Sequence, residues 1–171
     1  LIFIISNNAF CANFNSENSI SLNSPDNNLT LIFELKEGVP TYNLTFKGEE
    51  IISQSKLDIV FKDKPTKHKY RIINHDKQSV DLKWDQPWGE FKTIHDLHNE
   101  LRVVLNDQIS NSEMILIFKL FNDGLGFRYK FPNSENYESS TSIVIADELT
   151  EFNFKMDHDV WWIPVHSENS F

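Results

Sequence analysis

The sequence predicts an all-β fold, an antiparallel β-sandwich, and three observations carry this prediction. Residues 118–131 alternate apolar and polar side chains on both sides of Asn122-Asp123-Gly124, the pattern of two antiparallel strands joined by a tight turn. No window of about a dozen residues keeps a helical repeat. The chain contains 14 Phe, 4 Trp and 4 Tyr, and aromatic side chains favour sheets. At 171 residues, we expect one domain with a substantial core.

The first residues predict a targeting segment rather than part of the fold. Residues 1–5 form an apolar run, and small residues follow at Ala9, Cys11 and Ala12, as at the end of a secretory signal peptide. We therefore interpret residues 1–12 as the remnant of a signal peptide, and the protein as exported. The run is too short to span a bilayer. A lipid anchor on Cys11 is the less favoured alternative, because the aliphatic residues expected before it are missing.

The next segment predicts a flexible leader. Residues 13–23 are rich in Asn and Ser and show only weak periodicity. Order is expected to begin at Ser24-Pro25-Asp26, a turn-forming cluster. The folded sandwich domain is therefore predicted to span residues 24–171.

Within this domain, alternation predicts short strands separated by turns. Gly38 and Gly48 each follow a polar residue and mark two tight turns in a meander of three strands. Residues 114–121 are apolar on both faces, which indicates the most buried strand. Gly126 indicates a bulge or a close backbone approach. The expected strands span residues 29–35, 41–46, 50–52, 57–61, 70–73, 80–84, 91–94, 101–105, 114–121, 127–131, 142–146, 152–154 and 160–163.

Composition excludes several classes of function. The formal net charge is -9, which disfavours nucleic acid and anionic membrane surfaces as partners. A single cysteine excludes an intrachain disulfide and a cysteine-built zinc site. The sequence contains no Gly-rich phosphate loop and no Ser-centred nucleophile elbow.

One cluster predicts a carbohydrate-facing surface. Trp84 and Trp88 lie beside Asp, Gln and Glu residues, and sugars stack on aromatic rings while bonding to planar polar groups. The alternative is that these aromatics pack the edge of the sandwich. His95 and His98 do not predict a metal site, because their segment is not helical. The candidate substrate-binding residues are Trp88, Glu90, His98, Asn99 and Glu100.

Two further clusters leave their alternatives open. Asp147, Glu148, Asp157 and Asp159 supply paired carboxylates of the kind that glycoside hydrolysis uses, but carboxylates at strand ends are also ordinary solvated residues. Trp161 and its neighbour Trp162 should point to opposite faces of a strand. We assign no catalytic residue from these patterns.

A series of motifs then resembles a known family, the N-terminal domain of glycoside hydrolase family 97, which comprises bacterial α-glucosidases and α-galactosidases. The resemblance runs from about Ser24 to the end of the chain. The motifs, in order, are Ser24-Pro25-Asp26, Gly38-Val39-Pro40-Thr41-Tyr42, Gln86-Pro87-Trp88-Gly89-Glu90, His98-Asn99-Glu100-Leu101, Phe121-Asn122-Asp123-Gly124-Leu125-Gly126-Phe127-Arg128-Tyr129, Glu148-Leu149-Thr150-Glu151-Phe152 and Asp157-His158 to Trp161-Trp162-Ile163-Pro164.

The resemblance implies a fold similar to the galactose mutarotase super-sandwich, here incomplete at its C-terminal end. It implies a following (β/α)₈ barrel that holds the catalytic carboxylates, so the barrel and an oligosaccharide substrate are the expected partners. It also implies a calcium ion, with Glu168 as the ligand that this chain would supply. The expected location is the periplasm or the outer membrane of a Gram-negative bacterium.

Three hypotheses follow. The leading one is a non-catalytic fragment of an exported, calcium-dependent α-glycosidase, which supports the barrel and closes one wall of the substrate pocket. The second is a stand-alone carbohydrate-binding sandwich, motivated by Trp84, Trp88 and Trp161. The third is a purely structural interaction domain of an envelope protein.

Overall fold

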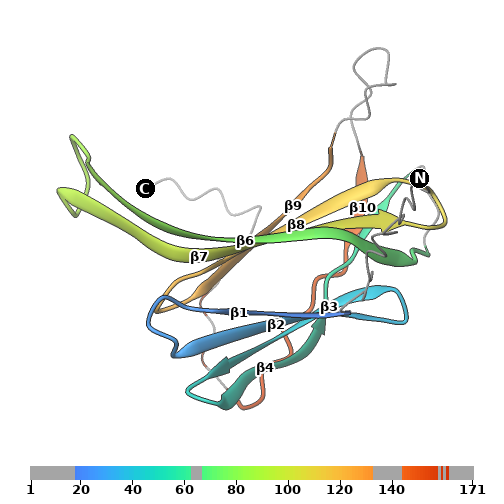
Figure 1. Ribbon diagram of the computed structural model, residues 1–171, viewed down its shortest axis with the longest axis horizontal. Helices are drawn as coiled ribbons and strands as arrows, with labels where there is room; N and C mark the ends of the chain where they lie inside the picture. Colours follow the sequence, from blue (N-terminus) through green and yellow to red (C-terminus); the bar gives the residue numbers. More distant parts are fainter. Residues whose placement is uncertain (1–17, 63–66, 133–143, 158, 160, 162–171) are drawn as a thin grey trace, which may run out of the picture.

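The structure, a computed structural model, describes residues 18–62, 67–132, 144–157, 159 and 161 (Figure 1). Within these residues there are ten strands and no helix, and every strand pairing is antiparallel. The described residues therefore contain no helix that could cross a membrane. The predicted all-β antiparallel sandwich is confirmed.

The first sheet is a meander in the order β1-β2-β3-β4. Its strands are β1 (Ser19–Asn23), β2 (Leu29–Lys36), β3 (Val39–Phe46) and β4 (Glu49–Lys56). Two-residue turns join β2 to β3 and β3 to β4, and φ is positive at both residues of each turn: 54° and 84° at Glu37 and Gly38, 51° and 85° at Lys47 and Gly48. Positive φ matches the turn to the twist of the flanking strands. Both predicted turns are confirmed.

Strand β1 corrects the predicted start of the ordered domain. Residues 13–23 were expected to form a flexible leader, but the last five of them pair with β2, and Ile20 and Leu22 are buried in the core. Two alternating apolar residues are enough to seat a short edge strand, although they are too few to give a clear period-2 signal. The remaining residues of the leader, and the predicted signal-peptide remnant with Cys11, lie outside the described residues.

The second sheet runs β6-β7-β8-β9. Its strands are β6 (Tyr70–Asp85), β7 (Thr93–Asp107), β8 (Glu113–Leu120) and β9 (Leu125–Lys130). Strands β6 and β7, of 16 and 15 residues, form one long hairpin where the sequence predicted four shorter strands. Backbone hydrogen bonds continue through the polar middle of both strands, because a ladder does not need apolar side chains. Figure 1 shows the far end of this hairpin projecting beyond the first sheet.

A bulge in β6 sets which side chains of this hairpin face the core. The register shifts between Ile72, opposite Leu105, and Asn74, opposite Val104. From Asn74 to the end of β6 the pairing is regular. Because Leu105 faces the core and Val104 faces away from it, the extra residue Ile73 reverses the alternation of β6.

A third, two-stranded sheet pairs β5 (Ile59–Phe61) with β10 (Ile145–Glu148). The strand predicted at residues 142–146 is therefore displaced toward the C-terminus. The strand predicted at 152–154 is only a single bridge between Phe154 and Ile52, and most of 160–163 lies outside the described residues.

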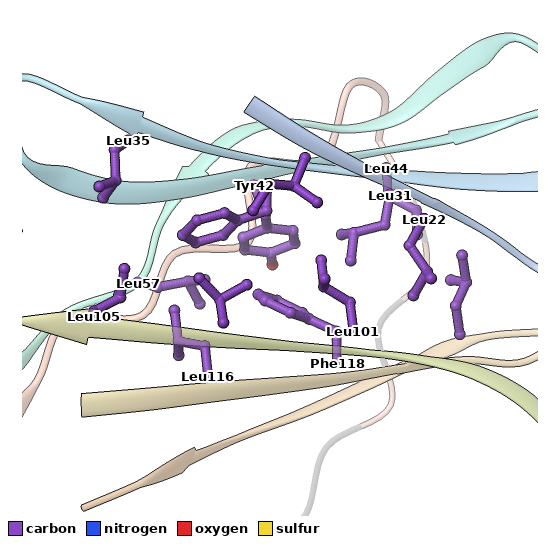
Figure 2. Packing of buried hydrophobic residues seen from close by; sticks show 14 of the residues in the cluster. Leu22, Leu31, Leu35, Tyr42, Leu44, Leu57, Leu101, Leu105, Leu116 and Phe118 are labelled. Atoms are coloured by element: carbon purple, nitrogen blue, oxygen red, sulfur yellow. The ribbon is translucent and has the colours of Figure 1, made fainter. Parts of the chain in front are cut away.

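The core lies between the two four-stranded sheets (Figure 2). Phe33 of β2 packs on Phe118 of β8 with ring centroids 5.9 Å apart, and Tyr42 of β3 packs on Phe127 of β9 at 5.7 Å. Strand β8 is buried on both faces, because Ile115 and its neighbours form a second apolar cluster on the far side of the sheet. The sequence prediction that β8 is the most buried strand is confirmed.

The predicted β8–β9 hairpin is confirmed, and its turn forms without positive φ. Phe121 N donates to Gly124 O at 2.8 Å, and neither Asn122, Asp123 nor Gly124 has positive φ. Gly126 pairs regularly with Lys119, and a Cβ built on it would meet no atom within 4 Å. The expectation of a bulge or a close approach at Gly126 is therefore wrong.

Candidate functional site

Two of the predicted sugar-binding residues lie at the tip of the β6–β7 hairpin. Trp88 is 84% exposed, and Glu90 is exposed beside it. The tip is closed by Gln86, whose backbone N donates to Lys92 O at 2.9 Å and whose Nε2 donates to Phe91 O at 2.7 Å. The loop therefore exposes the Trp88 indole ring and the Glu90 carboxylate to solvent, and the two hydrogen bonds of Gln86 hold its ends together.

The other three predicted residues lie along β7 and do not share one face. His98 is 1% exposed, and its Nδ1 lies 2.5 Å from Oδ1 of Asp96. Glu100 accepts from Nε2 of Gln78 at 3.0 Å on the same face. Asn99 points to the opposite face and donates to Asn23 O of β1 at 2.8 Å.

The structure therefore does not bring the five residues into one site. Asn99 lies six positions after Thr93, where β7 starts. At a rise of roughly 3.3 Å per residue, the tip therefore lies roughly 20 Å from Asn99. Sequence proximity suggested a cluster because the hairpin was not foreseen as one extended ribbon. Their role in binding substrate stays a prediction.

Asn99 does line a small polar hollow between β1 and the hairpin. Its volume is about 280 Å³. Ser79 Oγ donates to Asn99 Oδ1 at 2.7 Å and Asn99 Nδ2 donates to Asn23 O at 2.8 Å, so these three residues already bond to one another. The hollow is lined by Ser21, Leu22, Asn23, Lys77, Gln78, Ser79 and Asn99.

A larger hollow of about 820 Å³ opens at the other end of β6. It lies beside the β2–β3 turn, where Tyr70 N donates to Gly38 O at 2.8 Å. Its lining combines the apolar Leu35 and Ile72 with the charged Glu37, Lys69 and Arg71. No aromatic ring stands exposed there as a sugar platform, since Tyr70 is buried.

Sequence reasoning missed a buried carboxylate at the end of β7. The side chain of Asp107 is 0% exposed and bonds to His68 Nδ1 at 3.0 Å. It also accepts from Lys69 N at 3.0 Å, Ile109 N at 3.1 Å and Ser110 Oγ at 2.5 Å. Burial alone would raise the pKa of Asp107, but these hydrogen bonds outweigh it and hold the pKa well below its ordinary value. The polar run after β7 is typical of a turn capped by its own Asp.

The His68 ring, which bonds to this carboxylate, also packs against two aromatic rings. It stacks on Tyr70 with centroids 5.4 Å apart and meets the edge of Phe61 at 6.4 Å. Burial raises the pKa of the nearby Asp58, and its electrostatic interaction with His68 acts against that rise. His68 is 4% exposed, so the cluster is closed to substrate, and its geometry fits a structural latch between the 67–69 segment and β7.

Among the described carboxylates of the C-terminal segment, Glu151 bonds to another strand and Glu148 bonds within its own segment. Glu151 accepts from Lys56 N at 3.1 Å, and Lys56 Nζ lies 3.7 Å from its other oxygen. Glu148 accepts from Thr150 Oγ1 at 2.9 Å. Asp157 and Asp159 are exposed. These contacts support the reading of this cluster as strand-end residues.

The described residues contain no cluster of metal-binding side chains. Among them, no group of three or more His, Cys, Asp or Glu side chains lies close enough to hold a metal ion, whereas calcium takes six to eight oxygen ligands. Glu168, the predicted calcium ligand, lies outside the described residues. The role of Glu168 stays a prediction.

Most of this chain matches the solved structures of glycoside hydrolases. A glycoside hydrolase family 97 enzyme from Pseudoalteromonas sp. strain K8, solved with acarbose, is 34% identical with a TM-score of 0.72. The match covers 80% of this chain and 20% of that one. A variant of that enzyme solved with panose matches equally well. A β-arabinopyranosidase, at 21% identity and a TM-score of 0.70, shares the fold.

The chain spans about one fifth of the length of the solved enzymes that it matches. The model of the glycosyl-hydrolase 97 N-terminal domain matches residues 22–171, which is nearly all of the folded region and begins within β1. The motif order, the antiparallel sandwich and this match agree, and the chain belongs to glycoside hydrolase family 97, of which it contains the N-terminal domain.

Proposed function

We propose that this chain is the non-catalytic N-terminal domain of an exported, calcium-dependent α-glycosidase that acts on α-glucosides or α-galactosides. In this proposal the sandwich supports a separate (β/α)₈ catalytic barrel and lines one side of the substrate pocket. The observation that carries it is the family match over residues 22–171. Further support comes from the enzyme of 34% identity that was solved with panose, an α-linked glucose trisaccharide.

The chemistry of the described residues agrees with a supporting role. Glycoside hydrolysis needs two carboxyl groups placed across the scissile bond, one of which acts as an acid. The buried carboxylate here, Asp107, is saturated with hydrogen bonds and held ionised. Glu148 bonds to Thr150 of its own segment, and Glu151 bonds to Lys56 at the end of β4. We therefore expect the bond-breaking groups to come from the rest of the enzyme, with Glu168 as the one calcium ligand from this chain.

The test is an assay of the full-length enzyme on aryl α-glucosides and aryl α-galactosides. We expect turnover of one class, which falls on chelation with EGTA and returns with added calcium. A Glu168→Gln variant should need more calcium for the same rate. A full-length enzyme that is inactive on both classes with calcium present would overturn the proposal.

A second candidate function rests on Trp88. An indole ring that is 84% exposed next to Glu90 suits a sugar platform. A stand-alone binding domain would show saturable oligosaccharide binding that disappears in Trp88→Ala. A flat titration up to millimolar oligosaccharide would rule this candidate out.

A further inference from the structure

The free end of the β6–β7 hairpin has two chemically different faces. We call residues 79–85 of β6 and 93–99 of β7 the distal ribbon. Directly paired residues share a face in an antiparallel ladder, so its register assigns every side chain. The face on the side of the first sheet, the inner face, carries Ser79, Asp81, Lys83, Asp85, Thr93, His95, Leu97 and Asn99. The opposite face, the outer face, carries Val80, Leu82, Trp84, Ile94, Asp96 and His98.

Most side chains of the inner face are polar or charged. Thr93 Oγ1 donates to Asp85 Oδ1 at 2.7 Å, and His95 Nε2 lies 2.7 Å from Asp81 Oδ1. Ser79 and Asn99 bond across the strands at 2.7 Å. Cross-strand polar pairs of this kind stabilise a solvated sheet surface.

The outer face exposes two large apolar side chains toward its free end, whereas His98 at its other end is buried. Leu82 is 58% exposed and Trp84 is 47% exposed. The acidic group on this face, Asp96, is bonded to the His98 ring, which reduces its demand for water. A two-sided solvated ribbon would carry polar residues on both faces, and contiguous exposed apolar side chains mark interaction surfaces.

We infer that the outer face of the distal ribbon is the surface on which the catalytic domain of the same enzyme packs. This inference rests on the proposed function. About four fifths of the length of the solved relatives lies outside the matched region, and under the proposed function this length includes the catalytic domain that would pack on the ribbon. A domain tethered in cis needs only a modest apolar contact, because its effective concentration is high.

A second copy of the chain is the less favourable occupant. Each copy carries a formal charge of -9, so two copies repel each other over a Debye length. The inner face bears both Asp81 and Asp85, which would place further negative charge near such a contact.

Neighbouring positions on opposite faces allow a matched test in the full-length enzyme. Leu82→Cys places a thiol on the outer face, and Lys83→Cys places one on the inner face of the same strand. Both native side chains are exposed, so neither substitution removes core packing. The reaction rate of each thiol with a maleimide is read by mass spectrometry of the peptide that contains it, with the unfolded protein as the reference for full reactivity.

We expect the thiol at position 82 to react at least ~10-fold more slowly than the thiol at position 83, at every protein concentration. Equal rates at the two positions would overturn the inference, because the outer face would then be free. Protection that disappears on dilution would assign the face to a second copy instead. Protection that requires added oligosaccharide would assign it to a ligand.

The wild-type enzyme, assayed in parallel on aryl α-glycosides, separates the two possible failures. Turnover with equal thiol rates leaves the proposed function standing and removes the docking surface. Absence of turnover with strong protection at position 82 removes the glycosidase assignment, while a partner domain still covers the ribbon.

Discussion

The two halves of the β6–β7 hairpin share one hydrogen-bond ladder but differ in how many of their side chains are buried. In the proximal half, residues 70–77 and 101–107, Leu101, Val103 and Leu105 are fully buried against the first sheet. In the distal ribbon the ladder continues with the same regular pairing, yet His98 is the one buried side chain among its β7 residues. Backbone pairing alone therefore extends a strand, whereas side-chain burial decides where the stability of the domain resides.

The largest expected difference between the halves concerns two aspartates at strand ends. Asp107→Ala would leave Lys69 N and Ile109 N without their acceptor in a buried site, and we expect a loss of about 4 kcal/mol in the free energy of unfolding. Asp85→Ala removes one exposed bond with Thr93 and should lose about 0.5 kcal/mol. Urea denaturation of both variants measures the difference. Similar losses would contradict the division into a buried and a free half.

The next contrast compares two leucines on the same face of β7. Leu101 is buried, and Leu97 is only partly covered. Leu101→Ala should lower the free energy of unfolding by about 3 kcal/mol, because it opens a cavity in the core. Leu97→Ala, which removes the same atoms, should lower it by about 1 kcal/mol. An equal loss at both positions would mean that the distal ribbon is packed as tightly as the core.

The same comparison has a pH dependence. The pKa of Asp107 is lower in the folded protein than its ordinary value, so its contribution is complete above the unfolded pKa of about 3.9. That contribution is lost as the pH falls through the folded pKa. Asp107→Asn should therefore flatten the fall in stability below about pH 4. Asp58 acts in the opposite sense, because its pKa is raised by burial.

The sequence predicted the buried parts of this fold better than the exposed ones. Gly38 and Gly48 follow polar residues at the ends of alternating runs, and the structure gives both the positive φ that the turns require. Strand β8 was foreseen because both of its faces are apolar. The distal ribbon was predicted only as separate strands, at residues 80–84 and 91–94, since side-chain patterns do not show that its ladder continues into the proximal half.

The candidate site was also only partly predictable, because strand pairing cannot be read from side-chain patterns. Alternation alone predicts that His98 and Asn99 face opposite ways once their segment is known to be a strand. Which of them faces the first sheet depends on the pairing between β6 and β7, and the bulge at Ile73 that shifts the β6 register leaves no mark in composition. Asp107 lies in a polar run that resembles any loop, and only its burial distinguishes it.

The smallest contrast compares two glycines with positive φ. Gly38 has φ 84° and lies against the proximal half, where an added Cβ would come within 2.8 Å of Lys69 Cγ and 3.3 Å of Lys69 Cα. Gly89 has φ 125° at the distal tip, where a Cβ would meet only the side-chain amide of Gln86, at 2.5 Å. The Lys69 backbone is held by Asp107, whereas the Gln86 amide can swing away.

We therefore expect Gly38→Ala to lower the free energy of unfolding by about 2 kcal/mol, which combines backbone strain with the clash. Gly89→Ala should change it by less than about 0.5 kcal/mol, because few contacts link the tip to the core. Its effect should appear as faster hydrogen exchange in residues 86–92, where the bond from Gln86 to Phe91 O is lost. A global loss in Gly89→Ala would show that the distal ribbon unfolds together with the core and is not an independently opening arm.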